Sequence, residues 1–188
     1  MQKISDYFIE NLIAFLSVFF AAYLMTTFGS YTLELSALFY LPLGAKILVY
    51  LLFGFRVLPG VLAACVASGV ILFASWNDNL LLGTLSACAG AFAPIIVMGS
   101  MKLAKICDFN NLKDINFKYI LFMVMAVSVL SSVLKFFVFS KGINLNLEVF
   151  DFITHYIAGD VLGALLVVYL TLKLLVPLIQ WLVPQQAN

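Results

Sequence analysis

The sequence predicts an all-α integral membrane protein, a bundle of about six transmembrane helices that forms one domain over residues 1–188. Hydrophobic residues make up 64% of the chain, charged residues make up only 10%, and the mean hydropathy is +1.12. In a typical soluble domain, about a quarter of the residues are charged. A helix crosses a bilayer core of about 30 Å with roughly 20 apolar residues, and the chain divides into about six such stretches.

The apolar runs give the expected order of the spans. We expect the first over 12–28 and the second over 35–55, where Pro42 and Gly44 predict a kinked or re-entrant entry because proline removes a backbone donor. The third, over 57–75, follows so closely that it must form a hairpin with the second. The remaining spans are expected over 80–104, 119–139 and 152–175.

A short corner separates the second and third spans, and its residues are Gly54, Arg56, Pro59 and Gly60. Arg56 is expected to bind carbonyl groups at the end of the second span or a lipid phosphate. Gly60 lacks a side chain, so it should let the third helix return close to its neighbours. The corner is therefore predicted to be a structural element.

The distribution of Lys and Arg sets the predicted orientation, because short loops rich in these residues stay in the cytoplasm. An orientation with both termini in the cytoplasm leaves Lys141 as the one basic residue of the outer loops, beside Glu34, Asp78, Glu148 and Asp151. The other side then collects Lys3, Arg56, Lys102, Lys105, Lys113, Lys118 and Lys173. We therefore expect an N-in, C-in topology.

Several functions are not supported by the residues present. The net charge is +1 and the basic residues are scattered, so a nucleic-acid partner is not expected. The single histidine, His155, has no catalytic motif around it, and no glycine-rich phosphate loop follows a strand. Cys65, Cys88 and Cys107 lack the spacing of metal ligands. The sequence therefore predicts no enzyme, no metal site and no cofactor.

Two charged residues are expected near the middle of the membrane. Counting 1.5 Å per residue from the outer face places Lys46 about 16 Å deep and Asp160 about 12 Å deep, with His155 nearer the surface. Charges within a membrane pair with each other or line a polar cavity, so Lys46 and Asp160 are predicted partners. They serve either a ligand site or a purely structural ion pair. His155 is either a pH-sensing or ligand-binding residue of the same site or an interfacial histidine with satisfied hydrogen bonds. Lys135 is expected to extend to the outer surface.

The order of small and polar residues resembles a known family, the first class of membrane-associated sensor (MASE) domains, over about 35–175. The resemblance rests on Pro42 and Gly44, the corner of Gly54, Arg56, Pro59 and Gly60, and the later step of Gly159, Asp160 and Gly163. It implies a bacterial inner-membrane input module. Family members are commonly fused to histidine kinase or cyclic-diguanylate output domains. This chain has fewer predicted spans and reaches Asn188 without an output domain, so signalling is expected to need a partner protein in trans.

Two other functions stay open. The substrate-binding subunits of energy-coupling-factor transporters have a similar length and share a Gly-x-Arg corner and a Gly-Asp step, but Ala14, Ala21 and Ala22 do not form the expected alanine face on the first span. An assembly subunit of a larger membrane complex is the third alternative. The leading hypothesis is a sensor-like or ligand-binding module of the inner membrane.

Overall fold

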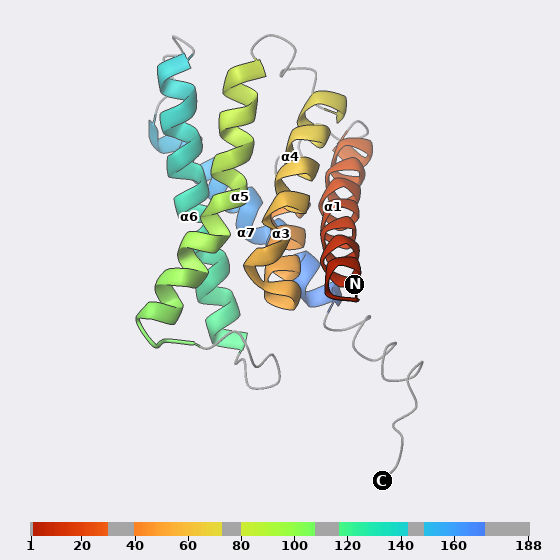
Figure 1. The fold of residues 1–188 in the computed structure, drawn as a ribbon. Helices are drawn as coiled ribbons and strands as arrows, with labels where there is room; N and C mark the ends of the chain where they lie inside the picture. The colour runs from red at the N-terminus through yellow and green to blue at the C-terminus, as the bar shows by residue number, and fades with distance from the viewer. Residues whose placement is uncertain (1, 30–39, 73–79, 108–116, 143–148, 172–188) are drawn as a thin grey trace.

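The computed structural model describes residues 2–29, 40–72, 80–107, 117–142 and 149–171 (Figure 1). These residues form helices and turns, which confirms the predicted all-α class. In chain order the helices are α1 (Gln2–Gly29), α3 (Leu41–Phe53), the 3₁₀ turn η1 (Gly54–Val57), α4 (Leu58–Leu72), α5 (Leu80–Leu103), α6 (Phe117–Gly142) and α7 (Val149–Leu170).

The helices have the length and the surface of a membrane protein. Four helical stretches are long and apolar enough to cross a bilayer: Ser5–Thr27, Leu41–Leu72, Leu80–Leu103 and Lys118–Val138. Tyr156–Leu170 is a shorter apolar helix. Large apolar side chains such as Phe8, Phe20, Leu81, Leu103 and Phe122 are exposed on the outside of the bundle, where lipid rather than water suits them. The chain is therefore a multi-pass membrane protein.

The stretch Leu41–Leu72 is a hairpin and not one straight helix. Gly54 has a φ of 72°, a left-handed value that glycine adopts without strain. Lys46 and Cys65 line one cavity, whereas a straight helix would separate them by about 28 Å. The chain therefore reverses at η1, as predicted, and α3 and α4 meet at the end of the bundle where α1 begins (Figure 1). The two helices do not pack along their length as the predicted hairpin would, because α1 packs against both of them.

Helix α3 is shorter than the predicted second span. Its 13 residues extend about 20 Å. Pro42 occupies the first turn of the helix, where its missing N–H costs little. Pro42 therefore starts the helix and does not kink it, while 35–39 lie outside the described residues. The short helix α3 begins inside the bundle rather than at its far end.

The other helix limits differ from the prediction mainly at polar ends. Helix α1 begins ten residues before the expected 12–28 span, since its first polar turns belong to the helix. Helix α5 agrees closely with 80–104, and α6 and α7 each begin two or three residues before the predicted 119–139 and 152–175. The predicted limits at 75 and 175 lie outside the described residues.

The six α-helices of the described residues close into a ring. Around it, α1 packs on α4, α4 on α5, α5 on α6, α6 on α7, α7 on α3, and α3 on α1. Small residues allow close approach at three of these contacts. An added Cβ at Gly60 would meet the Asn11 backbone, one at Gly163 would meet the Tyr40 backbone, and one at Gly44 would lie 2.9 Å from the Ala164 Cα. The ring encloses the site described next.

Candidate functional site

A cavity of about 180 Å³ lies inside the ring of helices. All six α-helices contribute to its wall, so the cavity depends on the closure of the ring. Its lining is mostly small side chains together with two lysines and two tyrosines: Val18, Ala22, Tyr40, Pro42, Lys46, Cys65, Ser68, Gly69, Ser86, Ala87, Gly90, Lys135 and Tyr156. The cavity therefore combines a mainly apolar wall with a few polar groups.

Lys46 enters the cavity from the second turn of α3 and is only 3% exposed. Its Nζ lies 5.8 Å from the centroid of the Tyr40 ring. On the facing helix α5, a Cβ at Gly90 would lie 3.2 Å from the Lys46 Nζ, so the absence of a side chain at Gly90 leaves room for the ammonium group. The structure thus places Lys46 in a polar interior, as its cost in lipid requires.

Lys135 also enters the cavity and does not reach the outer surface as expected; it is 5% exposed. The reason is the length of α6. The helix continues to Gly142 and not to Phe139, which places Lys135 about 10 Å from the helix end. The Lys135 Nζ lies 4.7 Å from the Tyr40 centroid and 5.0 Å from the Tyr156 centroid. Two cation–π contacts therefore hold this ammonium group, each worth about 0.5–2 kcal/mol.

Asp160 lies beside both lysines and is 1% exposed. Its carboxyl group lies within electrostatic range of both lysines. Among the described residues neither carboxylate oxygen accepts a hydrogen bond, and no direct ion pair joins Asp160 to Lys46 or Lys135. The predicted partners Lys46 and Asp160 are thus brought near each other, but within a cluster of three charges and not as an isolated contact pair.

The Gly159–Asp160–Gly163 step holds the backbone of Tyr40, whose ring contacts both lysines. The Tyr40 amide donates a 2.9 Å hydrogen bond to the carbonyl of Gly159. At Gly163 a side chain would collide with the Tyr40 backbone. Helix α7 therefore positions Tyr40 at the start of α3. His155 is part of α7, and its side chain lies outside the described part of the structure.

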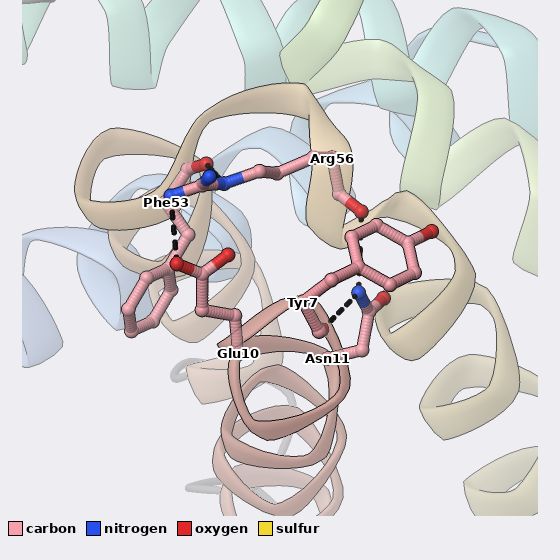
Figure 2. A network of polar contacts seen from close by, with 5 residues as sticks. All are labelled: Tyr7, Glu10, Asn11, Phe53 and Arg56. Atoms are coloured by element: carbon pink, nitrogen blue, oxygen red, sulfur yellow. Dashed lines mark hydrogen bonds and ion pairs between the residues drawn. The ribbon is translucent and has the colours of Figure 1, made fainter. Parts of the chain in front are cut away.

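The corner at Gly54 to Gly60 forms a second polar group, separate from the cavity (Figure 2). The Arg56 Nη2 pairs with the Glu10 Oε1 of α1 at 2.7 Å, and the Arg56 Nε donates to the Phe53 carbonyl at 3.1 Å. The second contact agrees with the expected role of Arg56 at the end of the preceding helix. Pro59 lies in the first turn of α4, where a backbone N–H would have no partner within the helix, so its absence costs no hydrogen bond.

Asn11 ties the corner to α1. Its amide nitrogen donates to the Tyr7 carbonyl at 2.9 Å and to the Arg56 carbonyl at 3.3 Å (Figure 2). Its amide oxygen accepts a 2.9 Å hydrogen bond from the Gly60 amide. The first N–H groups of a helix have no partner within that helix. Asn11 therefore caps α4 from a neighbouring helix.

The sequence reasoning missed several residues of both groups: Glu10, Asn11, Tyr40, Lys135 and Tyr156. Lys135 could have been found, because it stands in an apolar run just as Lys46 does. The two tyrosines gave no signal of their own, since tyrosine is common at both membrane interfaces.

In the part of the chain that the structure describes, no three His, Cys, Asp or Glu side chains gather as metal ligands. The cavity instead presents ammonium groups, aromatic rings, hydroxyl groups and the Cys65 thiol. Comparisons of the chain with protein-family models, with curated proteins and with solved structures found no match.

Proposed function

We propose that this protein is a ligand-binding module of the bacterial inner membrane, sensor-like in its role, and that the cavity of the helix ring is its binding site. It crosses the membrane six times, with α3 as the short second span and both termini in the cytoplasm. It acts on a partner protein and not by catalysis.

The burial of Lys46 and Lys135 at one cavity supports this proposal most strongly. A cationic side chain in the membrane interior costs roughly 2.5–3.5 kcal/mol on insertion scales. A protein that needed the charges only for packing would contact them with hydrogen-bonding groups on all sides. Here the two ammonium groups face an open space of about 180 Å³. Such residues in a membrane bundle mark a ligand or ion site.

The resemblance to MASE domains favours a sensor among the binding functions, since the residues that carry it also build the site. Gly159 and Gly163 position Tyr40, and Pro42 lines the cavity. A transporter subunit has less support, because Ala14, Ala21 and Ala22 of α1 are buried in the chain's own core. They offer no free face for docking a coupling subunit.

Ligand binding can be tested by filling the cavity. Gly90→Leu adds a side chain where the Lys46 ammonium lies, whereas a Cβ added at Gly99 of the same helix has nothing within 4 Å, so Gly99→Leu is the control. The full chain and both variants are purified in mild detergent, and their melting temperatures are measured with fractions of a bacterial small-molecule extract. A fraction that stabilises the wild type and Gly99→Leu, but not Gly90→Leu, supports the proposal. Equal stabilisation of all three, or none by any fraction, contradicts it.

The partner distinguishes the sensor from its alternatives. The tagged chain is isolated from membranes in mild detergent, and the retained proteins are identified. A kinase or a cyclic-diguanylate enzyme supports the sensor role, a coupling ATPase supports the transporter subunit, and a large stable complex supports the assembly subunit.

A further inference from the structure

The charges around the cavity do not balance. Among the described residues, the side chains at this site that carry a formal charge are those of Lys46, Lys135 and Asp160. Two positive charges face one negative charge, which leaves a single excess positive charge. The nearby Cys65, Tyr40 and Tyr156 add no counter-charge in their neutral forms. An uncompensated charge in a membrane interior requires a partner.

The start of α3 adds to the positive character of the cavity. Pro42, in the first turn of α3, is one of the lining residues. The N-terminus of a helix has a partial positive charge of roughly half an elementary charge, and half-helices that begin inside a membrane protein direct this end at anionic groups. The helix dipole and the two lysines thus favour the same sign of ligand.

The cavity has room for a small molecule. A protein cavity of roughly 150 Å³ can hold a molecule as large as benzene. The cavity of about 180 Å³ therefore accepts a ligand of a few non-hydrogen atoms, and the small side chains at Ser86, Ala87 and Gly90 leave that space clear. Lys135 is fixed between two aromatic rings and Lys46 lies against one of them, so both ammonium groups are held in position before a ligand arrives.

We propose that the cavity binds a small monoanion, an ion with one negative charge such as a short-chain carboxylate or chloride, between Lys46 and Lys135. One negative charge neutralises the excess of the cluster, whereas a dianion would leave the opposite excess and a neutral molecule would leave the site unbalanced. Asp160 sets this preference through its charge and without touching the ligand, because it is not one of the lining residues. This inference rests on the proposed ligand-binding function and specifies the chemical class of the ligand.

The test compares probes that differ in charge: acetate and acetamide are nearly equal in size, whereas chloride is smaller and succinate is larger. Binding of sodium acetate, sodium chloride, acetamide and disodium succinate to the full chain in detergent is measured by calorimetry at constant ionic strength. Sodium gluconate is not used to adjust the ionic strength, because gluconate is itself a carboxylate. Acetate or chloride should bind, and acetamide, the neutral analogue of acetate, should bind at least about tenfold more weakly. If acetate binds more tightly than chloride, the natural ligand is an organic anion; if chloride binds more tightly, it is an inorganic anion. Preference for acetamide or succinate in the wild type overturns the inference.

Variants of the cluster make the test specific. Lys46→Met and Lys135→Met should each weaken acetate binding at least about tenfold, while Lys102→Met, at an exposed position, should not change it. Asp160→Asn raises the excess to two positive charges and should shift the preference from acetate to succinate. An unchanged order of preference in Asp160→Asn contradicts the charge argument. If a lysine variant does not fold, the comparison of acetate, acetamide and succinate binding to the wild type still decides whether the cavity prefers a monoanion.

The outcome also separates this inference from the proposed function. When no anion binds but an extract fraction stabilises the wild type and not Gly90→Leu, the cavity is a ligand site and the monoanion inference is wrong. When neither the anions nor any fraction has an effect, both proposals are wrong.

Discussion

The backbone amide of Gly60 donates a 2.9 Å hydrogen bond to the side chain of Asn11, and this contact brings α4 against α1 at the corner. No space remains there for a Cβ, because the Asn11 backbone occupies the position that it would take. The contact explains why glycine is needed at the third residue of α4.

Gly60→Ala is therefore expected to destabilise the protein by about 1–3 kcal/mol through overpacking. Gly99→Ala is the matched control, since its new Cβ has nothing within 4 Å and alanine favours a helix by up to about 1 kcal/mol. The melting temperature in detergent should fall for the first variant and stay equal or rise for the second. Similar melting temperatures would show that α1 and α4 do not approach as closely as the structure has them.

Asn11→Ala should cost more stability than Arg56→Lys. The alanine variant leaves the Gly60 amide and the Arg56 carbonyl without their partner, at about 1–3 kcal/mol. The side chain of Arg56 is 59% exposed, and an ion pair at such a site contributes at most about 1 kcal/mol. Unfolding in a denaturing detergent series compares the two variants. A larger loss for Arg56→Lys would mean that the Glu10 pair, and not the cap by Asn11, holds the corner.

Removing Asp160 should harm the protein more than removing either lysine. Asp160→Asn leaves two buried ammonium groups without an anion, and a buried charge left alone costs about 3–5 kcal/mol. Lys46→Met leaves one ammonium and one carboxylate, a balanced pair. Thermal unfolding should therefore give a lower melting temperature for Asp160→Asn than for Lys46→Met or Lys135→Met.

Combined variants distinguish a cluster of three charges from a simple pair. Lys46→Met with Asp160→Leu should recover only part of the lost stability, because Lys135 then remains alone; adding Lys135→Met should recover more. Full recovery in the double variant would restore the isolated Lys46–Asp160 pair as the better description.

The orientation leads to a further prediction. A reporter enzyme that is active only outside the cytoplasm should be silent when fused after Asp108 and active when fused after Asn144, two positions outside the described residues. The reverse pattern of activity would place both termini outside.

How much of this could be predicted from the sequence depends on what each residue type reveals alone. Helix class and the hairpin at Gly54 followed from hydropathy and from glycine and proline, which act locally. Lys46 lies far enough inside an apolar run that burial within the protein was expected to cost less free energy than exposure to lipid. Lys135 was misplaced because the end of α6 was set at Phe139, whereas the helix continues through polar residues to Gly142. Hydropathy cannot show where a helix ends when its last turn is polar.

The start of α1 was misplaced for the same reason. Glu10 and Asn11 are polar and precede the predicted span of 12–28, but they contact the corner from within the helix. Tyr40 could not be assigned a role, because its ring meets the lysines only once α3, α6 and α7 have closed the ring of helices. Such contacts join residues far apart in the chain and leave no local pattern.

Tyr40 has two attachments, and they have a mechanical consequence. Its ring contacts the ammonium group of Lys135, while its backbone is hydrogen-bonded to Gly159 and leaves no free volume at Gly163. A displacement of this ring with its backbone therefore requires α7 to shift with it. A change at the centre of the bundle is in this way transmitted to a helix whose far end lies on the same side as the beginning of α1 (Figure 1).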